Sequence, residues 1–555
     1  MVVTSQADAT RAGHAMLVQG DNAVDAATAA AFAVGVTQPF STGIGGGAFV
    51  LVRLGPGRYV AIDARETAPA RATRDMFVRP GVADDASLRG GLAVATPGLV
   101  AGLVAVQERY GSLPLRTVLA PAIRLAGDGF EIGPYHARMI ERMRESLSGD
   151  ARFAETVRIQ FPPEGVAAEP GWRLVQRDLA DTLEAIARDG PRAFYEGAIA
   201  RAIARTMRET GGVLGEVDLA AYRTRERPVV TGSYRDVGVH SFPPPSSGGV
   251  ALVEALNILE GFDLSARPAG SSASIHLIAE ALKLAFADRA VYLGDPDFVD
   301  VPVARLTSKA HAQQLRARIN PPWYERPPWT WRFSGVERAI EVEAPGLPAD
   351  DSGTTHLSVT DASGMAVSIT ETINTPYGSG ITVAGTGIVL NNEMDDFAKA
   401  PDLPNVYGLV DVRGANAIAP GKRPLSSMTP TILDRDGALF MVTGSPGGPR
   451  IISTTLLTIV NVVDYGMDVK AAVSAPRFHH QWVPDTLFVE PGTPLDVIRG
   501  LEERGHHVEV GSRPWSAAEA IVIDPKTGVH LGGNDPRRDG LALGYDAARE
   551  AAPAH

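Results

Sequence analysis

The chain changes character at the stretch Gly353-Thr354-Thr355-His356-Leu357-Ser358-Val359. Polar and apolar side chains alternate through it, which is typical of a β-strand with two different faces. Residues 365–374 repeat the alternation and place Ser368, Thr370 and Thr372 on one face. The two segments predict a pair of antiparallel strands with hydroxyl-rich faces. On pattern alone, that polar face is expected to be solvated.

Residues 341–353, just before this stretch, are rich in proline, glycine and acidic side chains and predict an exposed loop. Composition alone favours a linker between domains. The 555-residue length fits two to four domains, or one large core with insertions. Further upstream, helices are expected over 5–19, 23–36, 248–259 and 271–292, and strands over 49–54 and 58–62. Downstream, a strand at 439–443 leads into a helix over 450–463.

Composition excludes several classes of function. The net charge is −12, which would repel nucleic-acid phosphates. Cysteine is absent, so disulfides, thiolate zinc sites and cysteine nucleophiles are excluded. No apolar run is long enough to cross a bilayer, so no membrane partner is expected. The N-terminus as written has no signal peptide. We expect a cytoplasmic protein as written, or a periplasmic or secreted one if an upstream segment is missing.

Three glycine-rich or acidic motifs suggest ligands. Gly447 and Gly448 lie between a strand and a helix N-terminus, where backbone N–H groups can bind either a phosphate or an oxyanion. The glycines of 43–47 follow a helix and precede a strand, the reverse of a dinucleotide loop. The acidic run 393–396 lacks the spacing of a calcium loop. We therefore expect no cofactor and no metal. His356, His479 and His480 are expected to be hydrogen-bonding partners rather than ligands.

Several motifs, in order along nearly the whole chain, resemble the gamma-glutamyltransferase family of N-terminal nucleophile hydrolases. They are residues 43–47, 63–69, 244–249, 353–356 with Thr372 and Asn374, 390–397, 423–430 and 443–448. The resemblance implies an α+β fold, a four-layer αββα sandwich formed jointly by two fragments. It also implies cleavage between Gly353 and Thr354. The large fragment would be 1–353 and the small catalytic fragment 354–555, and the two would remain associated as a heterodimer.

The resemblance assigns catalytic roles. Thr354 would be the nucleophile, with its own α-amine as the base once the chain is cut; the ordinary pKa of that amine is about 8, near what general-base catalysis needs. Thr372 would orient the Thr354 hydroxyl. Beside such a nucleophile, Gly447 and Gly448 are interpreted as an oxyanion hole.

It also assigns a substrate-binding site. Arg65 would hold the α-carboxylate of a glutamyl group, helped by Ser426 and Ser427. Acceptors for the α-ammonium would come from Asn374, Glu393 and Asp396, whose carboxylates are ionised at neutral pH if their pKa values stay at about 4. On residue type alone, Arg65 could instead form an ion pair with Asp63 or Glu66. Segment 396–414 resembles a lid loop, with Tyr407 covering the site.

The sequence therefore predicts an enzyme that cleaves gamma-glutamyl amides, such as glutathione or gamma-glutamyl peptides, and passes the glutamyl group to water or to an amino acid or peptide. Two alternatives remain open. One is another amidase on the same scaffold, a beta-lactam side-chain acylase or small-amide hydrolase, which need not keep Arg65, Glu393 and Asp396 together. The other is a non-catalytic binding homologue, which would leave the Gly353–Thr354 bond intact.

Overall fold

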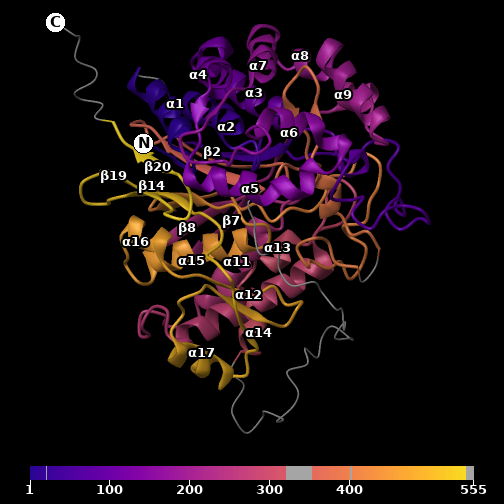
Figure 1. The fold of residues 1–555 in the computed structure, drawn as a ribbon. Coiled ribbons are helices and arrows are strands. Elements are labelled where there is room, and N and C mark those ends of the chain that lie inside the picture. The colour runs from indigo at the N-terminus through magenta and orange to yellow at the C-terminus, as the bar shows by residue number, and fades with distance from the viewer. Residues whose placement is uncertain (20–21, 320–352, 401–402, 546–555) are drawn as a thin grey trace, which may run out of the picture.

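The computed structural model describes residues 1–19, 22–319, 353–400 and 403–545. Two β-sheets lie face to face, with helices outside each (Figure 1). Each sheet contains strands from before and after Gly353. This confirms the expected α+β four-layer sandwich. The loop predicted at 341–353 lies outside the described residues except for Gly353.

The first sheet has seven strands, all paired antiparallel. Their order is β20 (Leu541–Leu543), β1 (Val2–Thr4), β9 (Thr354–Thr360), β10 (Ala366–Thr372), β2 (Gly47–Gly55), β3 (Arg58–Ala64) and β6 (Arg225–Arg227). The predicted pair β9 and β10 lies at the centre. Strands β20, β9 and β10 follow Gly353 and the other four precede it, so the segments 1–353 and 354–555 share this sheet.

The second sheet has six antiparallel strands. Their order is β19 (His530–Asn534), β18 (Glu519–Ile523), β14 (Ala438–Gly444), β13 (Thr431–Arg435), β8 (Val237–Ser241) and β7 (Val230–Tyr234). The sheets are joined by a small apolar cluster that includes Phe49, Leu51, Phe242 and Ile432. This sheet also combines strands from both segments.

The helices on the first sheet enclose the larger core, which contains the buried, alanine-rich α2. Asn22 caps α2, because its side chain accepts from the backbone of Val24 and Asp25. The helices of this layer are α1 (Ala7–Val18), α2 (Ala23–Thr37), α3 (Leu99–Tyr110), α4 (Leu115–Asp128), α5 (Pro134–Ser148), α6 (Ala154–Gln160), α7 (Arg177–Asp189), α8 (Arg192–Tyr195) and α9 (Gly197–Glu209). They occupy the upper half of Figure 1.

The helices on the second sheet include α12, whose N-terminus is capped by Ser271 as the sequence predicts. They are α11 (Gly248–Leu259), α12 (Ser272–Tyr292), α13 (Val303–Leu306), α14 (Lys309–Arg316), α15 (Arg450–Val463), α16 (Val469–Ser474) and α17 (Leu495–Glu502). The remaining elements are a helix and three small sheets. The helix is α10 (Glu216–Ala221). The sheets are β4 (Phe130–Glu131) with β5 (Arg173–Leu174), β11 (Thr382–Val383) with β12 (Ile388–Val389), and the three strands β15 (Phe478–His479), β16 (Leu487–Val489) and β17 (Val508–Val510).

The expectation of a solvated polar face on β9 and β10 is wrong. Both faces of both strands are buried. The polar face packs against the second sheet, where the Ser358 hydroxyl donates to the Glu519 carbonyl and the Ser368 hydroxyl to the Thr443 carbonyl. The hydroxyls therefore serve as hydrogen-bond donors between the sheets, because β14 and β18 cover them.

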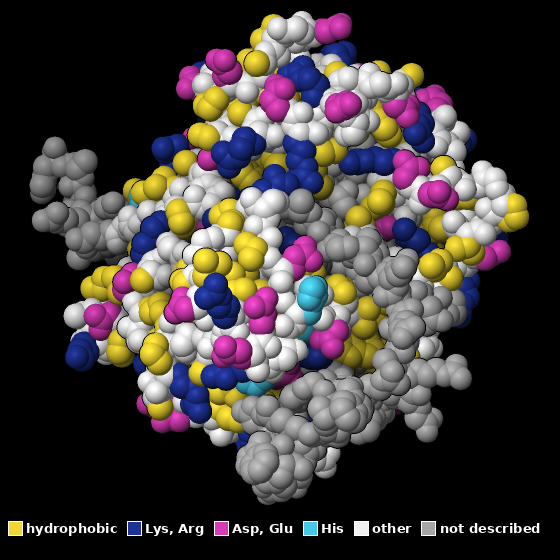
Figure 2. All heavy atoms as spheres, turned by 60° about the horizontal axis from the view of Figure 1, so that its bottom comes forward, with side chains coloured by type: hydrophobic (Ala, Val, Ile, Leu, Met, Phe, Trp, Pro, Cys, Tyr) yellow, Lys and Arg dark blue, Asp and Glu magenta, His cyan; other side chains and the backbone are white. Residues whose placement is uncertain are grey.

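Among the described residues, no helix is long and apolar enough to cross a membrane. Acidic and basic side chains are interspersed over the face shown in Figure 2. That mixture differs from the single basic stripe typical of nucleic-acid-binding surfaces.

Candidate active site

Thr354 is the first residue of β9 and lies directly opposite Thr372, the last residue of β10. Their hydroxyl oxygens are 2.9 Å apart, and both residues are buried. The alternation read from the sequence places both side chains on the same face of the sheet, as expected. The sheet register thus holds one hydroxyl beside the other without the help of a loop.

Thr372 also contacts the peptide bond in front of Thr354. Its hydroxyl donates to the Gly353 carbonyl oxygen over 2.8 Å and accepts from the Asn374 N–H over 2.8 Å. A hydroxyl has one proton to donate. With that proton on the Gly353 carbonyl, the Thr354 hydroxyl is the donor in the Thr354–Thr372 bond. The Ile373 N–H adds a second donor to the Gly353 oxygen at 3.3 Å.

A histidine on the same strand does not supply a base. His356 bonds Thr370 at 2.9 Å and Ser358 at 3.2 Å, and burial lowers its pKa to about 3. The other two histidines singled out in the sequence are also hydrogen-bonding partners: His479 contacts Ser453 and Gln481, and His480 accepts from the Trp482 N–H. The expectation for all three is confirmed.

The glycine pair lies at the turn between β14 and α15. Gly447 and Gly448 have φ values of 132° and 54°, a region that favours glycine. Among the described residues, neither backbone N–H has a hydrogen-bond acceptor. Gly448 lines the cavity that contains Thr354, whereas Gly447 does not. The structure thus brings one of the two glycines to the cavity wall.

The charged residues predicted for substrate binding form a buried cluster. The Arg65 guanidinium is ion-paired with both Glu393 and Asp396, and it lies 3.6 Å from Glu66. Arg65 Nε donates to the Pro424 carbonyl at 3.1 Å. The alternative ion pair with Glu66 is therefore present as a longer contact, but the side chain of Asp63 pairs with Arg227 and Arg423 instead.

Burial changes the charges expected in this cluster. It raises the pKa of Glu393 well above its ordinary value and also raises that of Asp396, while the Arg65 cation opposes both shifts. Burial raises the pKa of Glu66 to about 7. Burial alone would lower the pKa of Arg65. The negative charges of Glu393, Asp396 and Glu66 have the larger effect, and the pKa of Arg65 is raised above its ordinary value. The condition that the pKa values of the two acids stay near 4 is therefore not met, because both side chains are buried.

Asn374, Ser426 and Ser427 line the same cavity. Asn374 has φ +76° and donates from Nδ2 to the Asn392 carbonyl. The Ser427 hydroxyl is buried without a partner among the described residues. The backbone of Ser426 is fixed by the sequence motif at 244–249, since its carbonyl accepts from Ser247 and its N–H donates to the Pro245 carbonyl. That motif therefore positions the serines.

Tyr407 lines the cavity. Its hydroxyl donates to the Asn374 carbonyl at 2.9 Å, and its own carbonyl accepts from Gln481 at 3.0 Å. Asp395 anchors Val406, the residue before Tyr407, by accepting a hydrogen bond from its N–H at 2.8 Å. The enclosed space is only about 20 Å³, room for about one water. A glutamyl group therefore requires Tyr407 or the ion-paired side chains to move.

The glycine loop at 43–47 supports the site from behind. The Gly45 carbonyl accepts from the Asn391 side chain at 2.8 Å, and the Ser41 carbonyl accepts from the Ile373 N–H at 3.3 Å. A side chain at Gly46 would collide with the Thr372 carbonyl. The loop is therefore a packing element.

Two residues in contact with the site were missed from the sequence. Arg538 Nη1 donates to the Thr354 carbonyl at 2.8 Å, and the Tyr222 hydroxyl donates to the Arg65 carbonyl at 2.8 Å. Arg538 belongs to a charged run at 535–539, which is the only local signal for it. Tyr222 has no neighbouring motif, and only the fold brings it to Arg65.

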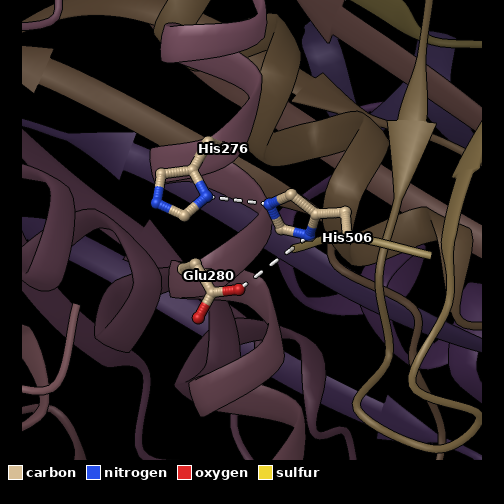
Figure 3. Close-up of side chains that lie close together, drawn as sticks. All are labelled: His276, Glu280 and His506. Carbon is tan, nitrogen blue, oxygen red and sulfur yellow. Dashed lines mark hydrogen bonds and ion pairs between the residues drawn. The ribbon is translucent and has the colours of Figure 1, made fainter. Parts of the chain in front are cut away.

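A histidine pair formed by α12 and the segment after α17 has, together with Glu280, the composition of a metal site. His276 and Glu280 lie one turn apart on α12 and face His506, which follows α17 (Figure 3). His276 Nδ1 and His506 Nε2 are 2.8 Å apart, and His506 Nδ1 is 4.0 Å from Glu280 Oε1. The short contact is a hydrogen bond between the rings, so one lone pair that a metal would need is already occupied.

A second group of potential ligands comprises Glu254, Asp288 and His311. His311 contacts Asp288 at 2.5 Å, and burial raises the pKa of Glu254 well above its ordinary value. Neither group lines the cavity at Thr354. Metal chemistry at these residues is therefore not required for a reaction at the threonine.

Comparison with known proteins agrees with this geometry. The family model described as gamma-glutamyltranspeptidase matches residues 9–545. A glutathione hydrolase proenzyme from Escherichia coli is 44% identical over 98% of this chain and 92% of its own length. An acylase ACY 1 proenzyme from Pseudomonas sp. strain V22 is 39% identical over all of this chain and 95% of its own. A solved cephalosporin acylase from Bacillus halodurans has a TM-score of 0.83 at 30% identity, covering 98% of this chain and 96% of that one.

Proposed function

Because the chain belongs to the gamma-glutamyltranspeptidase family, we propose that it is a self-processing gamma-glutamyltransferase and glutathione hydrolase. It cleaves gamma-glutamyl amides, with glutathione or a gamma-glutamyl peptide as substrate. One observation carries the proposal: the Thr354 hydroxyl shares a cavity with an arginine and two acids that can bind an α-amino acid head, namely Arg65, Glu393 and Asp396.

Self-cleavage begins when the Thr354 oxygen attacks the Gly353 carbonyl carbon. The C–N bond breaks, the hydroxyl proton passes to the released nitrogen, and an ester joins Gly353 to Thr354. Water then hydrolyses the ester to give a Gly353 carboxylate and a free Thr354 hydroxyl. The Thr372 hydroxyl and the Ile373 N–H, which contact the Gly353 oxygen, stabilise the negative charge that develops there.

Turnover uses the amine that cleavage exposes. The α-amine of Thr354 takes the hydroxyl proton while the oxygen attacks the gamma-carbonyl of the substrate. The N–H groups of Gly447 and Gly448 receive the oxyanion. The proton passes to the leaving amine and a glutamyl ester forms on Thr354. Water or an acceptor amine then attacks the ester and restores the threonine.

The substrate head would exchange with the ion pairs that Arg65 makes with Glu393 and Asp396. Its carboxylate takes the place of an acid on Arg65, with the Ser426 and Ser427 hydroxyls as further donors. Its ammonium binds Glu393, Asp396 and the Asn374 side-chain oxygen. A glutamyl head brings one charge of each sign, so the net charge of the buried cluster is unchanged by this exchange. Tyr407 then closes over the bound group and keeps water out.

The two fragments, 1–353 and 354–555, are proposed to remain a heterodimer. The small fragment contributes β9 and β10 between β1 and β2 of the large one, and the large fragment contributes β7 and β8 to the second sheet. Separation would break both sheets and expose their shared cores.

An acylase is the second candidate, since an acylase ACY 1 proenzyme also matches the whole chain. A matched pair of substrates separates the two functions. Gamma-glutamyl-p-nitroanilide carries the α-ammonium that Glu393 and Asp396 would bind, whereas glutaryl-p-nitroanilide lacks it. We expect the protein to release nitroaniline from the first at least about 10-fold more efficiently. Equal or better turnover of the glutaryl anilide would favour the acylase.

A further inference from the structure

We infer that a second pocket, which shares Tyr407 with the glutamyl site, binds the carboxylate of the leaving or acceptor peptide through Arg89. This inference rests on the proposed function and names the chemistry of the other half of the substrate. The pocket has a volume of about 440 Å³.

The pocket adjoins the reacting threonine. Gly353, Thr375, Pro376, Val406 and Tyr407 line it. Gly353 directly precedes the nucleophile, and Tyr407 lines the small inner cavity as well. Tyr407, which lines both spaces, is held by the hydrogen bond from its hydroxyl to the Asn374 carbonyl. A substrate whose glutamyl head occupies the small cavity would therefore extend past Tyr407 toward the second pocket.

Arg89 is one of three arginines that line the pocket. Its Nη1 donates to the Gly378 carbonyl at 2.8 Å and to the Pro376 carbonyl at 3.4 Å. Within the described residues, its Nε and Nη2 make no hydrogen bond, and no carboxylate lies within ion-pair distance of it. Burial lowers the pKa of Arg89, opposed by the more distant charge of Asp85. The guanidinium is thus anchored by one edge and has donors left for a ligand.

Arg152, which also lines the pocket, differs from Arg89 because its guanidinium is paired with a carboxylate. Asp150 accepts from it through contacts of 2.9 and 2.5 Å. Asp85 and Arg142 complete the charged lining. Arg152 is therefore neutralised by a carboxylate, whereas Arg89 is held by backbone carbonyls alone.

The ligand class follows from the reaction. The group that leaves the amide is an amine, and by reversibility an acceptor amine enters by the same route. The ester on Thr354 plus R–NH₂ gives a new amide plus the free threonine hydroxyl. A planar guanidinium with free donors suits a carboxylate, which amino acids and peptides carry at their C-terminus. The pocket therefore favours leaving and acceptor groups that end in a free carboxylate.

The test compares acceptors that differ only in that charge. Glycylglycine and glycylglycinamide would be offered to the mature enzyme with gamma-glutamyl-p-nitroanilide as donor, and transfer efficiency would be measured for each. We expect wild type to favour the acid by about 10-fold, the lower end expected for a charge-assisted hydrogen bond. Arg89→Gln should reduce that preference to less than about twofold while hydrolysis of the anilide, which has no carboxylate on its leaving group, changes by less than about twofold.

The controls make each outcome informative. Arg188→Gln, at an exposed arginine paired with Asp189 on α7, should leave the acid preference unchanged. No acid preference in wild type, or an undiminished preference in Arg89→Gln, would overturn the inference. If Arg89→Gln does not mature, wild type decides: a preference that falls with added salt supports the charge pair, and one that is absent or insensitive to salt overturns it. Failure of wild type to cleave the anilide would count against the proposed function instead.

Discussion

The hydroxyl oxygens of Thr354 and Thr372 lie 2.9 Å apart at facing ends of two central strands. Because the pair is part of a continuous antiparallel register, its geometry depends on seven consecutive residue pairings between β9 and β10. A slip of one residue would turn Thr372 to the other face of the sheet. The relationship therefore explains why a buried strand end, rather than a loop, can hold a nucleophile.

Replacing Thr372 should slow self-cleavage. Thr372→Ala removes a donor to the Gly353 oxygen and the acceptor for the Thr354 hydroxyl, so we expect cleavage to slow by about 100-fold. Thr372→Ser keeps the hydroxyl and is the matched control. The rate is measured as loss of the 555-residue chain on denaturing gels. Normal cleavage in Thr372→Ala would exclude this role.

Replacing Arg65 should impair binding more than maturation. Arg65→Gln removes the proposed carboxylate partner, and we expect KM for a gamma-glutamyl anilide to rise by about 100-fold. Self-cleavage requires no external carboxylate and should proceed. The variant also leaves Glu393 and Asp396 without their cation, so stability should fall by about 3–5 kcal/mol. An unprocessed but folded chain would contradict this division of roles.

The ammonium site can be tested with an acetylated substrate. An N-acetyl gamma-glutamyl anilide keeps the carboxylate and the scissile amide but loses the positive charge. Wild type should turn it over at least about 10-fold less efficiently than the free form, and Asp396→Asn should narrow the gap. Equal turnover of both forms by wild type would remove the assignment of Glu393 and Asp396 to the amine.

Tyr407 should control access of water. Tyr407→Phe removes the hydrogen bond to the Asn374 carbonyl while keeping the ring, so the loop should open more often. We expect free glutamate to rise by about 5-fold relative to transferred glutamyl product, since one neutral hydrogen bond is worth about 1 kcal/mol. Product analysis at fixed acceptor concentration measures the ratio. An unchanged ratio would mean that the hydroxyl does not hold the lid.

Glu66 should make stability depend on pH. Burial raises its pKa from the ordinary 4.5 to about 7 in the folded protein. Between these two pH values the folded state holds a proton that the unfolded state loses. The contribution of Glu66 to the free energy of unfolding is therefore complete below about pH 4.5 and is lost as the pH rises through about 7. Thermal unfolding across this range should show a smaller decline in Glu66→Gln than in wild type. Parallel curves would show that Glu66 does not titrate in this way.

The sequence predicted local features best. The bounds of β9, α11 and α15 agree with the expected segments, because their period-2 or helical patterns are uninterrupted. The resemblance brought together residues that do line one cavity, including Arg65, Thr354 and Glu393. Their roles as nucleophile and ligands remain predictions.

The errors arose where distant segments meet. The polar face of β9 was expected in water because nothing near residue 354 indicates that β14 and β18 cover it. The pKa values of Glu393 and Asp396 were taken as ordinary because burial depends on the whole fold. Arg538 was missed for the same reason: its contact with the Thr354 carbonyl spans 184 residues of chain.

The most direct test of the account is the mass of the denatured protein after acid quenching during turnover of a gamma-glutamyl anilide. The account predicts two fragments of 353 and 555 − 353 = 202 residues. The smaller should begin at Thr354 and carry one glutamyl group on that residue, and Thr354→Ala should remain a single chain without it. An intact wild-type chain, a different N-terminus on the smaller fragment, or a glutamyl group on another residue would contradict Thr354 as a self-generated nucleophile.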